Sequence, residues 1–166
     1  MIDEKIQETD EEIDLIEAEE QAEADVLAQR EEALARELAE MRNRKRKLVD
    51  PLQYALSIAA EDLANYTPTF VWEMAPPSEK QLAFLEGRGI FADGVTNAGM
   101  ASLLIDRLMR RQEEGLATPK QIRLLERYGF RQVGTWTFES ASKLIGMIAG
   151  NRWSLPRGMN PAAFRP

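Results

Sequence analysis

Two stretches that lie 40 residues apart decide the fold of this chain: SEKQLAFLEGRGI at residues 78–90 and TPKQIRLLERYGF at residues 118–130. Each begins with a Ser or Thr placed three residues before a Gln, which is the spacing of a capping box at a helix N-terminus. Each ends at a Gly followed by an apolar residue, a pattern typical of a helix that stops at a left-handed residue. The two stretches therefore predict two short helices of the same kind.

The match continues beyond these helices at the same spacing of 40 residues. Matched pairs include Gly94 and Gly134, Ala101-Ser102 and Ala141-Ser142, and Leu104-Ile105 and Leu144-Ile145. Asn97 and Thr137 can cap a second helix in each copy. A repeat with a constant period indicates one structural unit used twice. We predict two tandem helical hairpins, residues 80–108 and 120–148, within a segment that spans residues 78–150.

Residues 3–47 predict one long helix, because they contain neither Gly nor Pro and are rich in good helix formers. Apolar side chains recur at one heptad position: Ile6, Ile13, Leu27, Leu34, Met41 and Leu48. The companion heptad position is mostly polar, whereas a strong coiled coil has apolar residues at both. We predict a long acidic helix over residues 1–48. It could form a coiled coil with a copy of itself, pack on another domain, or stand partly solvated.

The remaining segments are predicted to be less regular. Asp50-Pro51 is a helix start signal, with Asp50 as the cap and Pro51 at the first helical position. Over residues 49–77 we predict a short helix that runs through Leu63, followed by an extended, proline-rich connector at residues 66–77 whose apolar segment 70–74 should be tucked against the repeats. Residues 151–166 contain three prolines and predict an irregular tail. The expected fold class is all-α.

Composition argues against several classes of function. The chain has no Cys and no His, so it has no disulfide, and neither a structural zinc site nor a serine-type catalytic triad is expected. It also lacks the glycine-rich motifs that hold nucleotide phosphates. We therefore expect no catalytic residues, no metal and no cofactor. The first 20 residues are acidic and no long apolar run follows, so we expect a cytoplasmic protein without a membrane partner.

The net charge of −7 hides two parts of opposite sign. Residues 1–40 hold 16 Asp and Glu against three Lys and Arg, a net charge of −13, so the remainder carries −7 + 13 = +6. The acidic part would repel nucleic acid, but the charge of the C-terminal part permits binding to a polyanion.

The candidate binding residues follow the second repeat. Lys120, Arg123 and Arg127 share one face of the predicted helix, and Arg131 comes just beyond it. In the first repeat only Lys80 keeps a basic residue at the matching positions. Neither Lys80 nor Lys120 is explained by capping, because a cation at a helix N-terminus opposes the helix dipole. These residues could contact DNA phosphates, or they could form an ordinary solvated face.

Two further features admit two interpretations each. The basic cluster at residues 42–47 suits the C-terminal end of the long helix, and it could also contact phosphates. Trp136 lies in the loop before a helix, where it could stack on an unpaired base if it is exposed. The alternative for Trp136 is packing in the core.

Segments from residue 49 to the C-terminus resemble the C-terminal region of DEAD/DEAH-box helicases of the phage and prophage type. The resemblance rests on VDPLQYAL (49–56), EDLANY (61–66), WEMAPPSEKQ (72–81), GLATPKQIRLLERYG (115–129) and GTWTF (134–138). In that family the ATPase motor precedes this region, and the motor motifs are absent here. The resemblance implies an accessory role beside a helicase, without ATP hydrolysis or unwinding. The helical hairpins are also similar in shape to small DNA-binding modules of the SAP type.

These observations lead to one expected function and one alternative. The expected function is a non-catalytic DNA-binding accessory domain, with a helicase motor or another replication or recombination protein as partner. Its candidate DNA contacts are Lys80, Lys120, Arg123, Arg127, Arg131 and Trp136. The alternative is a protein-interaction or dimerisation module in which the acidic helix is the active part, forming a weak homodimer or mimicking DNA toward a basic partner.

Overall fold

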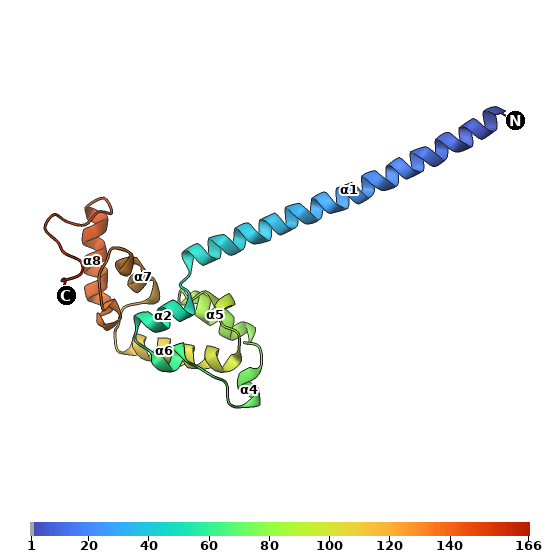
Figure 1. Ribbon diagram of the computed structural model, residues 1–166. Helices are drawn as coiled ribbons and strands as arrows, with labels where there is room; N and C mark the ends of the chain where they lie inside the picture. Colours follow the sequence, from blue (N-terminus) through green and yellow to red (C-terminus); the bar gives the residue numbers. More distant parts are fainter. Residues whose placement is uncertain (1) are drawn as a thin grey trace. The chain divides into compact units, whose positions relative to one another are not determined.

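The computed structural model describes residues 2–166 and confirms the all-α fold class, with no β-strand in that range. The helices follow the chain in the order drawn in Figure 1: α1 (Ile2–Lys47), α2 (Pro51–Ser57), α3 (Glu61–Ala64), α4 (Val71–Met74), α5 (Glu79–Gly87), α6 (Ala98–Glu113), α7 (Pro119–Arg127) and α8 (Phe138–Gly150). Two short 3₁₀ turns, Ala92–Gly94 and Val133–Thr135, precede α6 and α8. The chain divides into two compact units, Met1–Asn43 and Arg44–Pro166.

The two hairpins, α5–α6 and α7–α8, begin 40 residues apart with the same capping groups. The hydroxyl oxygens of Ser78 and Thr118 each accept a hydrogen bond at 3.2 Å from the backbone N–H of the Gln three residues later. Gly89 and Gly129 have φ values of +90° and +93°, the left-handed conformation that a C-terminal glycine supplies. The predicted helix starts and ends are therefore confirmed in both copies.

The capping glutamines also tie the two helices of each hairpin together. Gln81 Nε2 donates to Ser102 Oγ at 3.0 Å, and Gln121 Nε2 donates to Ser142 Oγ at 2.9 Å. The sequence pointed to capping alone for these glutamines. The second hydrogen bond explains why both Gln and Ser recur at the same spacing, because each pair joins the first helix of a hairpin to the second.

Helix α2 joins the two hairpins through a pair of matched glycines. A Cβ on Gly94 would lie 2.8 Å from Cγ of Pro51, the first residue of α2. A Cβ on Gly134 would lie 2.6 Å from the carbonyl oxygen of Ser57, the last residue of α2. Each hairpin thus needs its glycine to let one end of α2 approach closely, and α2 lies between the hairpins in Figure 1.

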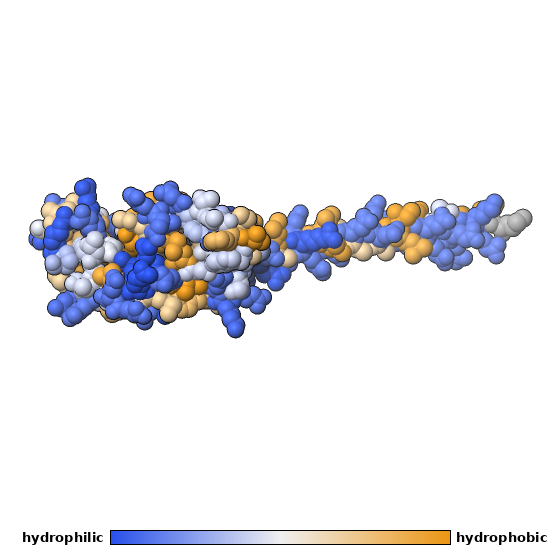
Figure 2. Space-filling view, turned by 90° about the horizontal axis from the view of Figure 1, so that it is seen from below, coloured by the Kyte–Doolittle hydropathy of each residue, from blue (hydrophilic) through white to orange (hydrophobic). Residues whose placement is uncertain are grey.

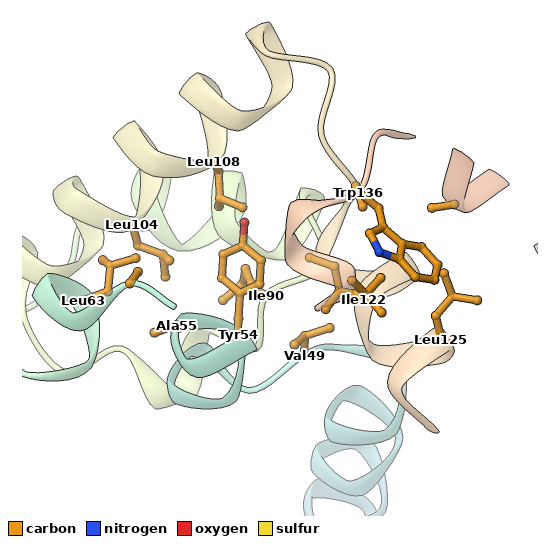
Figure 3. Close-up of a cluster of buried hydrophobic side chains, with 14 of the residues drawn as sticks. Val49, Tyr54, Ala55, Leu63, Ile90, Leu104, Leu108, Ile122, Leu125 and Trp136 are labelled. Atoms are coloured by element: carbon orange, nitrogen blue, oxygen red, sulfur yellow. The ribbon is translucent and has the colours of Figure 1, made fainter. Parts of the chain in front are cut away.

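One hydrophobic core runs through the Arg44–Pro166 unit. Figure 3 shows Tyr54 and Ala55 of α2 facing Leu104 and Leu108 of α6, with Ile122 and Leu125 of α7 farther along the same cluster. Val49, Tyr54, Ala55, Ala60 and Leu63 are all at least 96% buried. Residues 49–63 therefore supply core residues between the hairpins, in addition to linking them to α1.

Residues 49–77 differ from the prediction in three respects. The predicted helix is interrupted after Ser57, near Ala59 with its φ of +55°, and resumes as the single turn α3. The connector contains a further single turn, α4, and the side chains of Phe70, Val71, Trp72 and Met74 are exposed. The expectation that this apolar segment is tucked against the repeats is wrong. Helix α4 instead faces the hairpin through Glu73, whose Cβ lies close to Gly99 of α6, so the apolar side chains of the turn are left outside.

The tail, residues 151–166, contains only turns and irregular backbone, yet it completes the core of the second hairpin. The Phe164 ring packs at 5.5 Å from the Phe130 ring and 5.6 Å from the Trp136 ring. Leu155 and Met159 also pack partly against the core. Apolar burial rather than regular hydrogen bonding holds this segment in place.

Helix α1 is continuous over 46 residues, and none of them is buried. The heptad residues Ile6, Ile13, Leu27 and Leu34 expose between 47% and 58% of their surface. Figure 2 shows apolar patches separated by hydrophilic side chains along this helix. Among residues 2–166, no helix combines the length and the apolar character needed to cross a membrane.

Candidate nucleic-acid interface

The structure places four of the predicted basic residues at the surface. Lys80 and Lys120 occupy the second position of α5 and α7, Arg127 ends α7, and Arg131 follows the glycine turn. All four side chains are exposed, and none forms an ion pair within the described part of the chain. Their positive charge is therefore not neutralised by a neighbouring carboxylate.

Arg123 has a different environment from the one predicted. Its guanidinium is half-buried and donates hydrogen bonds to the carbonyl oxygens of Lys47, at 3.3 Å, and Leu48. Burial lowers the pKa of Arg123, and the positive charge of Arg127 lowers it further. The sequence predicted a phosphate contact for Arg123; in the structure its guanidinium satisfies carbonyls at the end of α1 that have no partner within that helix.

This contact brings together two basic clusters that are more than 70 residues apart in the sequence. Lys45, Arg46 and Lys47 form the last turn of α1 and are exposed, while Arg44 beside them pairs with Glu86 and Asp93. Because Arg123 holds this turn against α7, the charges of both segments lie on one part of the same unit. We call Lys45, Arg46, Lys47, Lys120 and Arg127 the basic surface.

Trp136 is not available to a nucleic acid base in this structure. Only 3% of its surface is exposed, and its ring packs edge-on at 5.7 Å from the ring of Phe130. The exposed stacking role predicted for Trp136 is therefore wrong. Trp136 lies in a loop, a position that often leaves a side chain exposed. This loop is pinned by a backbone hydrogen bond from Ala117 to Trp136, and the tail then covers the ring.

Three arginines in the last turns of α6 have specific partners. Arg107 pairs with Asp62 at 2.6 Å, and Arg110 pairs with Asp106 at 3.0 Å. Arg111 is buried and donates to the carbonyl oxygens of Gly134, at 2.9 Å, and Ala117, at 3.3 Å. The sequence does not predict the burial of Arg111, because its hydrogen bonds to these carbonyls depend on the packing of the second hairpin against the end of α6.

The different environments of Arg123 and Arg127 lead to a prediction on stability. Arg123→Ala removes two hydrogen bonds to carbonyls and should lower the free energy of unfolding by about 1 kcal/mol or more. Arg127→Ala removes an exposed, unpaired charge and should change it by less than about 0.5 kcal/mol. Urea unfolding of both variants tests this difference. Equal effects would mean that the Arg123 contacts do not stabilise the fold.

Comparison of the chain with protein-family models, with curated proteins and with solved structures finds no match in any of the three.

Proposed function

We propose that the Arg44–Pro166 unit is a non-catalytic DNA-binding module that works beside a helicase motor. The main support for DNA binding is the basic surface, in which two clusters distant in sequence are held together without paired carboxylates. Residues 44–166 contain 17 Lys and Arg against 12 Asp and Glu, a net charge of 17 − 12 = +5. Several of the 12 carboxylates are already engaged: those of Asp62, Glu86, Asp93 and Asp106 pair with arginines within the unit.

The proposed contacts are to phosphates and not to base edges. The basic surface consists of Lys and Arg side chains only, and Trp136, the tryptophan of the second hairpin, is buried. Such a surface supports affinity and positioning on the backbone, while sequence readout needs side chains placed in a groove. The link to a helicase rests on the resemblance of residues 49–166 to the region that follows the motor in the phage-type enzymes. A motor would supply the ATP hydrolysis for which this chain has no motif.

Salt dependence tests the DNA-binding proposal. Binding of the full chain to single-stranded, duplex and forked DNA should weaken linearly on a log–log plot, with a slope of roughly −4 if five phosphates are contacted. Replacing Lys47 and Arg127 together by Gln should reduce the slope by roughly two, because two contacts are lost. Fluorescence anisotropy over a range of salt concentrations measures both slopes.

A matched control uses two exposed charges elsewhere in the same unit. Replacing Lys143 and Arg157 by Gln changes the net charge equally, but neither residue belongs to the basic surface. This control should leave the slope nearly unchanged. A control slope that falls as much as that of the test variant would show general charge attraction, and absence of any salt-sensitive binding would refute the proposal.

A second candidate function is self-association through α1. The observation that favours it is the set of half-exposed heptad residues on a helix with no buried side chain. Residues 1–40 carry a net charge of −13, so two copies in parallel repel each other at low salt. Any dimer should therefore strengthen as salt rises, which sedimentation velocity at low and high salt can measure. A dimer that weakens with salt would require opposite-charge contacts between the copies.

A further inference from the structure

A pocket of about 550 Å³ lies between the two hairpins, within the Arg44–Pro166 unit. The end of α5, the end of α6 and the start of α7 form its walls, and Tyr54 of α2 contributes from the core. The volume falls within the range of about 300–1,000 Å³ that is typical of sites for small organic ligands. The pocket is therefore large enough for an organic group in addition to an inorganic anion.

The charges that line this pocket are all positive. Arg88, Arg111 and Lys120 belong to the lining, and no Asp or Glu does. None of the three forms an ion pair with a described residue. Arg88 donates to the neutral side chain of Gln112 and lies over the Phe84 ring, so no carboxylate neutralises its charge. Three cations without a carboxylate favour a ligand that carries a negative charge greater than one.

Two of the lining residues, Arg111 and Tyr54, carry buried polar atoms without regular partners. Arg111 is 8% exposed; its Nη2 donates to two carbonyls, but its Nε has no acceptor and its Nη1 donates to no group within residues 2–166. Tyr54 is 1% exposed, and its hydroxyl lies beside the Arg111 side chain without a hydrogen bond of regular geometry. Buried polar groups are normally paired, because leaving one unpaired destabilises the fold. Nε and the hydroxyl are enclosed by protein, whereas Nη1 of Arg111 is not, so Nη1 can donate to an acceptor oxygen of a bound ligand.

The start of α7 adds a further donor at the pocket wall. Pro119 has no N–H, and Gln121 donates its N–H to Thr118, so the free amide at this end of the helix is that of Lys120. A helix N-terminus with free N–H groups favours an anion. The side chain of Lys120 lies over Gly89, whose lack of a Cβ leaves room for it.

Leu108, Leu116 and Phe138 give the same pocket an apolar part. We propose that it binds an organic phosphate monoester, with the phosphate held by Arg111, Arg88 and Lys120 and the organic group against these apolar side chains. A phosphate monoester is close to a dianion at neutral pH and offers three strong acceptor oxygens. A free nucleotide and the terminal phosphate of a DNA strand share this chemistry.

Calorimetric titration of the full chain with adenosine monophosphate tests the proposal. Saturable binding should be detectable at about 1 mM ligand or below, and adenosine and inorganic phosphate should each bind at least about tenfold more weakly. No saturable binding of the monophosphate, or equal binding of adenosine, would overturn the proposal. Inorganic phosphate binding as tightly as the monophosphate would overturn the organic part of the site.

Arg88 and Lys120 line the pocket but are exposed, so their substitution should leave the fold intact. Arg88→Gln combined with Lys120→Gln should weaken binding of the monophosphate by about tenfold or more, since each removes one charge from the phosphate site. Lys80→Gln combined with Arg131→Gln is the matched control: Lys80 occupies the same helix position as Lys120 one repeat earlier, and neither residue lines the pocket. Equal losses in both double variants would refute the site.

Competition between two oligonucleotides then identifies the source of the phosphate. If a DNA end is the ligand, a 5′-phosphorylated strand should displace the monophosphate better than the same strand with a 5′-hydroxyl. If a free nucleotide is the ligand, both strands should compete equally while the monophosphate still binds. The inference does not rest on the proposed DNA-binding function, because the Lys47→Gln, Arg127→Gln variant should lose DNA affinity and still bind the monophosphate.

Discussion

Gly134→Ala is expected to lower the free energy of unfolding by about 3 kcal/mol, the upper end of the range for overpacking. The reason is space and not backbone conformation, since Gly134 is not among the glycines with positive φ. A Cβ at this position would lie 2.6 Å from the carbonyl oxygen of Ser57 and 3.0 Å from Cα of Ile58. Both are backbone atoms at the end of α2, so relief requires α2 to move and the core to open.

Gly146→Ala provides the matched control for this substitution. Gly146 lies in α8 of the same hairpin, and an added Cβ there would meet no atom within 4 Å. Alanine should stabilise the helix at this position by about 0.5–1 kcal/mol, because glycine has poor helix propensity. Urea unfolding monitored by circular dichroism compares the two variants. If both have the same small effect, α2 does not lie against the second hairpin as closely as described.

The features that sequence analysis predicted correctly depend on residues close together in the chain. A capping box joins residues three apart, and the caps Asn97 and Thr137 accept from backbone N–H groups three residues later. The glycine ends of α5 and α7 likewise follow from local sterics. The break that separates α2 from α3 and the single-turn helix α4 were not predicted, since such short turns have almost no stability of their own and depend on tertiary packing.

The candidate site was predicted less well, because its side chains have partners that are distant in sequence. The sequence predicts that Arg123 belongs to an exposed basic helix face. In the structure it donates a hydrogen bond to the carbonyl oxygen of Leu48, 75 residues away. The loop position of Trp136 suggests an exposed ring, but in the structure the Phe164 ring packs against it. A spacing of three or four residues shows which side chains share a helix face, and it does not show which other segment packs on that face. The residues with no distant partner, Lys120 and Arg127, stayed at the surface.

The second large effect is expected from removal of the acidic helix. Deleting residues 1–40 should tighten DNA binding by about tenfold or more at low salt, because it removes a net charge of −13 from a chain whose remainder carries +6. The deletion keeps the last turn of α1, with Lys45, Arg46 and Lys47. It should leave the melting temperature of the remaining unit almost unchanged, since no core residue comes from the deleted segment.

A full-length variant in which the 16 acidic residues of this segment are replaced by Gln separates charge from bulk. If the effect is electrostatic, this variant should bind DNA as tightly as the deletion, and the gain in both should shrink as salt rises, because the screening length falls to about 8 Å at physiological ionic strength. A gain seen only in the deletion would indicate steric obstruction by the helix. Weaker DNA binding by the deletion variant would mean that the N-terminal segment itself contributes to the complex. That result would favour an interaction role of α1 over repulsion of DNA by its negative charge.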